Sequence, residues 1–204
     1  MAFRYIIGID EVGRGALAGP VTVGAVALRV GARFEPGILK NRRIKLRDSK
    51  RISPAGRERW VKYLRGRKDI RFKVASVSPK IIDRTNISRA ANLAATRAFE
   101  KLADYPVLKT QPLVFLDGGL YLKGNWGKRL KVRTVVKGDE KIDAIKLASI
   151  VAKVYRDKLM TRRHKKYPRY GFAKHKGYGT ALHIKSLKHY GLSEIHRKSF
   201  CRFI

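Results

Sequence analysis

The sequence is poor in cysteine, in acidic residues and in long apolar runs. Its single cysteine, Cys201, cannot form an internal disulfide, and it leaves no second cysteine for the usual zinc sites. No apolar run approaches the ~18 residues of a membrane-spanning helix. The apolar stretch at residues 5–9 is stopped by Asp10 and Glu11 before it reaches the length of a signal-peptide core. We therefore expect a cytoplasmic protein without a membrane span and, because no oligomerisation segment is recognisable, a monomer.

The scarcity of acidic residues produces a very large positive charge. The 204 residues include 48 Lys and Arg but only 15 Asp and Glu, which gives a formal net charge of +33. Such an excess is self-repulsive unless a polyanion shares the surface, so it favours a nucleic-acid partner over a merely solvated basic surface. Charge alone does not distinguish an enzyme from a non-catalytic, duplex-binding protein.

The hydrophobic pattern predicts one α/β domain. Short β-branched runs predict strands, and apolar residues at helical spacing predict helices, one of them opened by Ser53 as N-cap and Pro54. We expect a mixed central sheet flanked by helices, with a catalytic core over 1–160 and a small basic helical appendage over 161–204. The expected strands are 3–9, 21–28, 71–77, 113–116 and 131–136, and the later helices are 88–103, 142–159 and 181–190.

Several of the few carboxylates stand where predicted strands end. Asp10 and Glu11 follow the first strand, Asp117 ends another and Asp139 follows a third. Carboxylates drawn together repel one another, whereas a divalent metal keeps them ionised. Oxygen ligands of this kind suit Mg²⁺ or Mn²⁺, and such ions can promote hydrolysis of the phosphodiesters that a polyanion offers. The residues by themselves therefore indicate a metal-dependent nuclease.

Two features leave alternatives open. Asp117 and Asp139 could be ordinary turn residues, because Asp is favoured in turns. Asp10 and Glu11 are neighbours, and neighbours on a strand face opposite sides of a sheet. Both can serve one site only if the strand ends or bulges between them, which the glycine-rich segment that follows makes feasible.

That glycine-rich segment also admits a different function. The spacing Gly13-x-Gly15-x-x-x-Gly19 after a strand is similar to a dinucleotide-binding turn. Two observations count against it: the carboxylates would lie beside the pyrophosphate, and the following VTVGAVAL has strand composition where a helix N-terminus is required.

The run IIGIDEVGRGALAGPV at residues 6–21 resembles the N-terminal motif of ribonuclease HII. Further segments resemble that family in the same order and extend the resemblance over essentially the whole chain: RDSK (47–50), LDG (116–118), KGDEKIDAIKLASIVAKVYRD (137–157), YGFAKHKGYGT (170–180) and HRKSF (196–200). The chain departs from the family at Gly119, where Asn is common, and in AIKL, where Lys146 adds bulk and charge beside the expected site.

The resemblance implies a ribonuclease H-like fold and an endonuclease that cuts the RNA strand of RNA/DNA hybrids. It also implies cleavage on the 5′ side of ribonucleotides embedded in duplex DNA, leaving 5′-phosphate and 3′-hydroxyl ends. It assigns two divalent ions, Mg²⁺ or Mn²⁺, to four catalytic carboxylates: Asp10, Glu11, Asp117 and Asp139. Asp143 and Asp157 compete for the fourth place, although Asp157 lies well within a helix and is expected to pair with a basic neighbour.

The resemblance also implies how the substrate is held. Gly13, Arg14 and Gly15 match a loop whose backbone senses the ribose 2′-hydroxyl, where a side chain would block the approach. Tyr178 matches a tyrosine that stacks on the deoxy sugar at an RNA–DNA junction. Six further residues match polar positions near the phosphates: Ser49, Lys50, Ser149, Lys153, His175 and Lys176. We do not expect His175 to act as a base or a ligand, because the metal scheme needs no imidazole.

Overall fold

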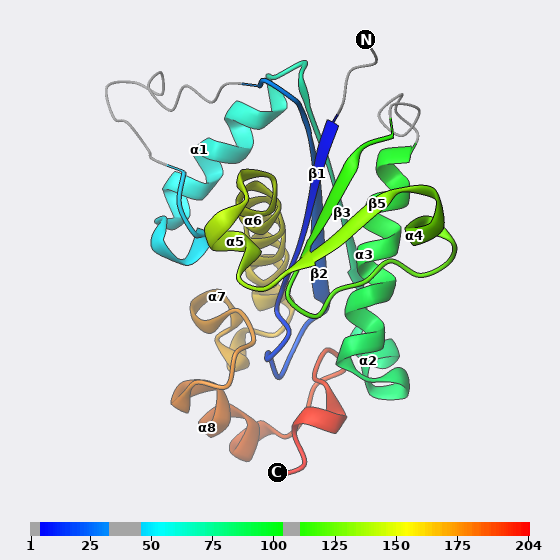
Figure 1. Ribbon diagram of the computed structural model, residues 1–204. Coiled ribbons are helices and arrows are strands. Elements are labelled where there is room, and N and C mark those ends of the chain that lie inside the picture. The colour runs from blue at the N-terminus through cyan, green and yellow to red at the C-terminus, as the bar shows by residue number, and fades with distance from the viewer. Residues whose placement is uncertain (1–4, 33–45, 104–110) are drawn as a thin grey trace.

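The computed structural model describes residues 5–32, 46–103 and 111–204 (Figure 1). A five-stranded mixed sheet forms its centre, in the order β3-β2-β1-β4-β5. The first three strands pair antiparallel, whereas β4 and β5 run parallel to β1. The strands are β1 (Tyr5–Val12), β2 (Val21–Arg29), β3 (Ile70–Val77), β4 (Leu113–Asp117) and β5 (Lys131–Val135). The predicted α/β fold with a mixed sheet is confirmed.

Helices cover both faces of the sheet. Figure 1 shows α1 and α6 on one face and α2 and α3 on the other, with α7 and α8 beyond one end of the sheet. The α-helices are α1 (Pro54–Arg65), α2 (Pro79–Thr85), α3 (Ile87–Ala103), α4 (Trp126–Arg129), α5 (Gly138–Lys141), α6 (Asp143–Lys166), α7 (Phe172–His175) and α8 (Ala181–Tyr190). Short 3-10 turns are η1 (Ser49–Arg51), η3 (Pro168–Tyr170) and η4 (Lys198–Phe200). None of these helices is long and apolar enough to cross a membrane.

Alternation along the central strands builds a core on each face of the sheet. Ile7 and Ile9 of β1 are fully buried against the small side chains of α3, in a cluster that also contains Phe99. Val26 of β2 packs on the other face with Trp60 of α1 and the apolar side of α6. The side chain of Ser53 accepts a hydrogen bond from the N–H of Gly56 at 3.2 Å, as its predicted N-cap role requires.

Helix α6 lies unusually close to the sheet because two glycines face it. A Cβ added to Gly8 of β1 would lie 2.1 Å from the carbonyl carbon of Ala144, and one added to Gly24 of β2 would lie 2.4 Å from the carbonyl oxygen of Ala148. The helix backbone therefore rests on the backbone of the two central strands. This contact fixes the height of α6 above β1.

Two predicted boundaries were wrong. The first strand does not end at Ile9, because its ladder with β2 continues through Asp10, Glu11 and Val12. Helix α6 does not end near residue 159 but runs to Lys166, so the expected division between residues 160 and 161 falls inside a helix. No glycine or proline occurs between Asp143 and Pro168, so no helix-breaking residue ends the helix earlier.

The C-terminal region has a small core of its own that is rich in aromatic rings. The imidazoles of His175 and His183 stack with 4.3 Å between ring centroids, and the Nε2 atoms of His183 and His196 lie 3.0 Å apart. Burial lowers the pKa of His183 and His196 to about 4, so these rings are neutral at pH 7. Isolated bridges join this region to the segment after β1, at Ala16–Tyr178 and Ala18–His196. The C-terminal region is thus attached directly to the glycine-rich segment.

Candidate active site

A cavity of about 460 Å³ lies where β1 passes the end of β4, beside the first half of α6. It gathers residues from seven separate parts of the chain: the end of β1, the turn after it, η1, β4, α5, α6 and the segment between α7 and α8. Twelve of the fourteen residues predicted for the site line it: Asp10, Glu11, Gly13, Arg14, Gly15, Ser49, Lys50, Asp117, Asp139, Ser149, Lys153 and Tyr178. His175 and Lys176 do not.

The strand register brings Asp10 and Asp117 side by side. The last parallel pair between β1 and β4 is Ile9 with Leu116, so the next residue on each strand is a carboxylate. Asp10 is only 5% exposed. Burial raises the pKa of Asp10 well above its usual range, and the charges of Glu11 and Asp117 raise it further. A hydrogen bond with Ser149 and the main-chain N–H of Glu11, at 2.7 Å, oppose that rise.

Glu11 reaches the same cavity without a break in its strand. Because β4 ends at Asp117, β1 has no paired residue in β4 beyond Ile9, and the successive residues Asp10 and Glu11 both line the cavity. Burial raises the pKa of Glu11, whereas Arg14, whose Nη1 lies 3.1 Å from Glu11 Oε1, opposes the rise. The expectation that the strand must end or bulge between the two carboxylates was therefore wrong. It is the neighbouring strand that ends.

Asp139 enters from the first turn of α5. Its pKa is raised by burial and by the charge of Asp117, and it is lowered by Lys50, whose Nζ lies 3.8 Å from Asp139 Oδ2. Asp117 itself accepts a hydrogen bond from the N–H of Gly138 at 2.7 Å, which joins the end of β4 to the start of α5. The two carboxylates predicted as possible turn residues therefore lie on the two elements that this hydrogen bond joins, and both line the cavity.

The rival carboxylates lie elsewhere. Asp157 is held by Arg57 at 3.4 Å and by Lys153 at 2.9 Å, and so pairs with basic neighbours as predicted. The Asp143 side chain is 52% exposed and pairs with Lys146 at 2.9 Å. Lys146 thus directs its charge toward Asp143, and it does not line the cavity that it was expected to crowd.

The chemistry of the four cavity carboxylates suits a hard divalent cation. Burial and mutual repulsion raise the pKa of three of them, and Glu11 Oε2 is buried without a hydrogen-bond partner among the described residues. A bound divalent cation would keep these carboxylates ionised and would give Glu11 Oε2 a partner. Within the described ranges, no three acidic, histidine or cysteine side chains are already gathered closely enough to hold a metal ion. Binding would therefore require the carboxylates to turn toward the ion.

The turn after β1 forms the wall of the cavity. Gly13 has a φ of +85°, and a Cβ there would lie 2.1 Å from Arg156 Nε. Gly15 has no atom within 4 Å of its Cβ position. Gly13 is therefore needed for packing, while Gly15 presents bare backbone to the open cavity. The turn leads into β2 without a helix, which excludes the dinucleotide-binding alternative.

Polar side chains from η1 and α6 line the opposite wall. Ser49 Oγ and Ser149 Oγ are 2.8 Å apart, and both side chains are buried. Tyr178 completes the rim, with Lys153 Nζ at 5.7 Å and Arg156 Cζ at 5.3 Å from its ring centroid. Both distances are typical of a cation–π contact.

The two predicted residues outside the cavity have structural contacts. His175 is buried, and its Nε2 lies 2.6 Å from the carbonyl oxygen of Tyr170. Lys176 directs its Nζ to Thr161 Oγ1 at 3.0 Å. The sequence match therefore placed the right segment near the site but not these two side chains.

The sequence analysis missed two buried arginines, Arg156 and Arg197, which support the turn after β1. Both lie in segments that resemble the family motifs, in KVYRD and HRKSF, which was the available signal. Neither lines the cavity. In a chain with so many arginines, composition could not single them out.

A mixed sheet with carboxylates at adjacent strand ends, flanked by helices and set in a basic chain, defines a nuclease of the ribonuclease H-like class. The sequence profile described as Ribonuclease HII matches residues 7–203. The chain belongs to the ribonuclease HII family, the endonucleases that cleave RNA in RNA/DNA hybrids and at ribonucleotides embedded in DNA. The family and the reaction predicted from the motifs are thereby confirmed.

Individual relatives agree over nearly the full chain. Ribonuclease HII of Chloroherpeton thalassium is 41% identical over 199 residues, covering 97% of this chain and 90% of that protein. Ribonuclease HII of Caldicellulosiruptor bescii is 42% identical over 203 residues, covering 99% and 89%. Among solved structures, ribonuclease H2 of Pyrococcus horikoshii superimposes with a TM-score of 0.68 at 26% identity, covering 96% of this chain and 93% of that one.

Proposed function

We propose that Asp10, Glu11, Asp117 and Asp139 hold two divalent ions, Mg²⁺ or Mn²⁺, and that this centre hydrolyses the phosphodiester on the 5′ side of a ribonucleotide. The products would be a 5′-phosphate and a 3′-hydroxyl. Bound ions of this kind activate a water molecule and stabilise the leaving oxygen. The observation that carries the proposal is that four carboxylates, in a chain that has so few, line one cavity.

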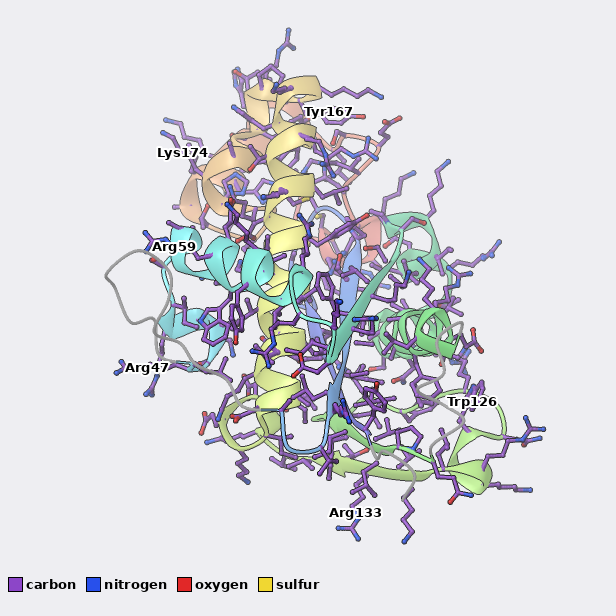
Figure 2. The ribbon with its side chains drawn as sticks, turned by 90° about the horizontal axis from the view of Figure 1, so that it is seen from above. Arg47, Arg59, Trp126, Arg133, Tyr167 and Lys174 are labelled. Carbon is purple, nitrogen blue, oxygen red and sulfur yellow. The ribbon has the colours of Figure 1, made fainter. Side chains whose placement is uncertain are left out.

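The remaining cavity residues would bind and orient the duplex. The turn Gly13–Gly15 offers backbone groups to the ribose, and Tyr178 offers a ring face to the neighbouring sugar. Lys50 and Lys153 lie beside the carboxylates and would contact phosphate oxygens. Figure 2 shows Arg59, Arg133 and Lys174 on three different elements, so basic side chains are not confined to the cavity. Such a surface favours duplex binding that weakens steeply with salt.

The chain is proposed to act as one catalytic unit, since the C-terminal region is bonded to the turn that lines the cavity. We expect it to work as a monomer in the cytoplasm. One relative, from Archaeoglobus fulgidus, was solved in a complex of PCNA with RNase HII. A related RNase HIII was crystallised with Mn²⁺. By analogy we propose a sliding clamp as a partner, and Mn²⁺ beside Mg²⁺ as a cofactor.

The test is cleavage of an end-labelled DNA duplex that carries one ribonucleotide, beside an all-DNA duplex, with Mg²⁺, Mn²⁺ or chelator. We expect a metal-dependent cut on the 5′ side of the ribonucleotide, and none in the all-DNA duplex. Binding without cleavage under every condition would instead favour the alternative, a non-catalytic duplex-binding protein. In that case Asp10→Asn would leave binding unchanged.

A further inference from the structure

The two largest fully buried side chains in the described part of the chain are both arginines. Arg156 and Arg197 are each 0% exposed. Burial lowers the pKa of both guanidiniums, that of Arg197 to about 9. Their hydrogen bonds within the described residues all go to main-chain carbonyl oxygens. Removing a charge from water is costly, so the hydrogen bonds of these arginines must have a role that an apolar side chain could not fill.

Arg197 holds the turn that follows β1. Its Nη2 donates to the carbonyl of Gly13 at 2.7 Å, its Nη1 to that of Arg14 at 2.8 Å and its Nε to that of Gly19 at 3.0 Å. The guanidinium is rigid and planar, and its donors diverge in fixed directions. One side chain therefore sets the orientation of three peptide groups in the turn.

The orientation of these carbonyls determines where the amide protons point. The peptide bonds are trans, so the C=O of one residue and the N–H of the next point in opposite directions. Because Gly13 and Arg14 turn their carbonyls inward to Arg197, the N–H groups of Arg14 and Gly15 point away from it. Within the described residues these two N–H groups have no hydrogen-bond partner. They belong to the wall of the cavity, where Gly15 adds no side chain.

Arg156 joins the same turn to Tyr178. It donates to the carbonyl of Ala18 at 3.1 Å, to that of Lys176 at 2.8 Å and to that of Pro20 at 3.2 Å. Its Cζ lies 5.3 Å from the centre of the Tyr178 ring. Arg156 thus connects the two elements that are proposed to contact the sugars on either side of the cut.

We propose that Arg197 and Arg156 are positioning residues for sugar recognition. Arg197 directs the N–H groups of Arg14 and Gly15 into the cavity as donors for the oxygen of a ribose 2′-hydroxyl, and Arg156 fixes Tyr178 relative to them. Neither arginine touches the substrate. This inference rests on the proposed function, because it requires the turn to contact the ribose.

The first experiment compares Arg197→Lys and Arg156→Lys with the wild type. The substrates are a duplex with one ribonucleotide and the same duplex with a 2′-fluoro nucleotide in its place. Lysine keeps the charge but cannot orient three carbonyls. We expect kcat to fall about tenfold or more, roughly the value of one hydrogen bond, while KM stays nearly constant because the contacts with the duplex backbone remain. The preference for the 2′-hydroxyl over 2′-fluoro should shrink by a similar factor.

The matched control is Trp60→Phe, which alters a buried side chain of the α1–α6 cluster, away from the turn. A general loss of stability would affect this control and the arginine variants alike, whereas only the arginine variants should lose the 2′-hydroxyl preference. Folded variants that keep both kcat and this preference would overturn the inference. If the wild type itself cleaves neither substrate with Mg²⁺ or Mn²⁺, it is the proposed function that fails.

A second measurement uses the wild type alone and so does not depend on whether the variants fold. In amide NMR spectra recorded without catalytic metal, the N–H signals of Arg14 and Gly15 should shift when the ribonucleotide-containing duplex is added. The all-DNA duplex should shift them far less. Equal shifts with both duplexes would also overturn the inference.

Discussion

Replacing Asp10 by Asn should stabilise the metal-free protein while it abolishes cleavage. Asp10 is 5% exposed, and its pKa is raised chiefly by burial and further by Glu11 and Asp117. Asparagine has nearly the same shape and keeps an oxygen that can accept from the N–H of Glu11, as Asp10 Oδ1 does at 2.7 Å. The substitution therefore removes a charge and preserves the contact.

The size of this stabilisation follows from the cost of burying a polar group that hydrogen bonds compensate only in part, about 1–3 kcal/mol. For a chain of this length, each kcal/mol changes the melting temperature by roughly 2–4 °C. We therefore expect a rise of about 2–12 °C in the presence of chelator at pH 7. A carboxyl whose pKa is raised on folding contributes stability below its ordinary pKa and loses it as the pH rises. The difference between Asp10→Asn and the wild type should therefore narrow as the pH approaches ~4.

Thermal melts in chelator and in excess Mg²⁺ measure this effect, with a cleavage assay on the same samples. A ligand that binds only the folded protein raises its melting temperature, so Mg²⁺ should stabilise the wild type more than Asp10→Asn. Asp143→Asn is the matched control, since that side chain is 52% exposed and lies outside the cavity. Its melting temperature should change little, and its cleavage should persist.

Two results would refute the reasoning. If Asp10→Asn melts below the wild type in chelator at pH 7, the carboxylates are not mutually destabilising in the metal-free protein. If the variant still cleaves at the wild-type rate, Asp10 does not hold a catalytic metal. The first result concerns the electrostatics of the cavity and the second its chemistry, so each can fail separately.

Three further predictions concern the histidine core, the glycines and the charge. The pKa of His183 and His196 is lowered to about 4 by burial, so the free energy of unfolding should fall as the pH drops from ~6.5 toward 4, and a constant melting temperature across that window would contradict it. Gly13→Ala should cost about 1–3 kcal/mol in unfolding experiments because of its φ of +85° and the 2.1 Å approach to Arg156 Nε. Gly15→Ala should leave the melting temperature unchanged but lower kcat, and equal losses of stability in both variants would argue against this assignment. Duplex affinity should fall by about 10³-fold or more between ~50 and ~200 mM salt, as titration by fluorescence anisotropy would show; a shallow slope would mean fewer than about six phosphate contacts.

The sequence predicted the fold and the members of the site better than it predicted how they meet. Alternating apolar residues and the N-cap at Ser53 indicated the strands and helix α1, because these depend on local pattern. The carboxylates were singled out because acidic residues are so few. Their convergence depends on β4 lying beside β1 and ending one residue past the last parallel pair, which is a property of strand order that no local pattern contains.

The residues that escaped prediction are those whose role depends on tertiary contacts. Arg156 and Arg197 are separated from the turn that they hold by more than a hundred residues, as the hydrogen bonds to Ala18 and Gly13 show. The prediction that His175 lies near the phosphates did not match the structure for the opposite reason. His175 belongs to a matching segment, but its side chain packs in the aromatic core. A motif places a stretch of chain near a site, but the backbone decides which side chains enter it.

The close seating of α6 on Gly8 and Gly24 has a mechanical consequence. The same helix carries Ser149, which forms a hydrogen bond with Asp10, and Arg156, which holds the turn proposed to contact the ribose. Sliding or tilting this helix would displace Ser149 and Arg156 together, so the proposed metal site and the proposed ribose-binding turn could not be altered independently of the core. On this proposal, a variant designed to alter the preference for ribose would change the turn itself and leave Gly8 and Gly24 under the helix intact.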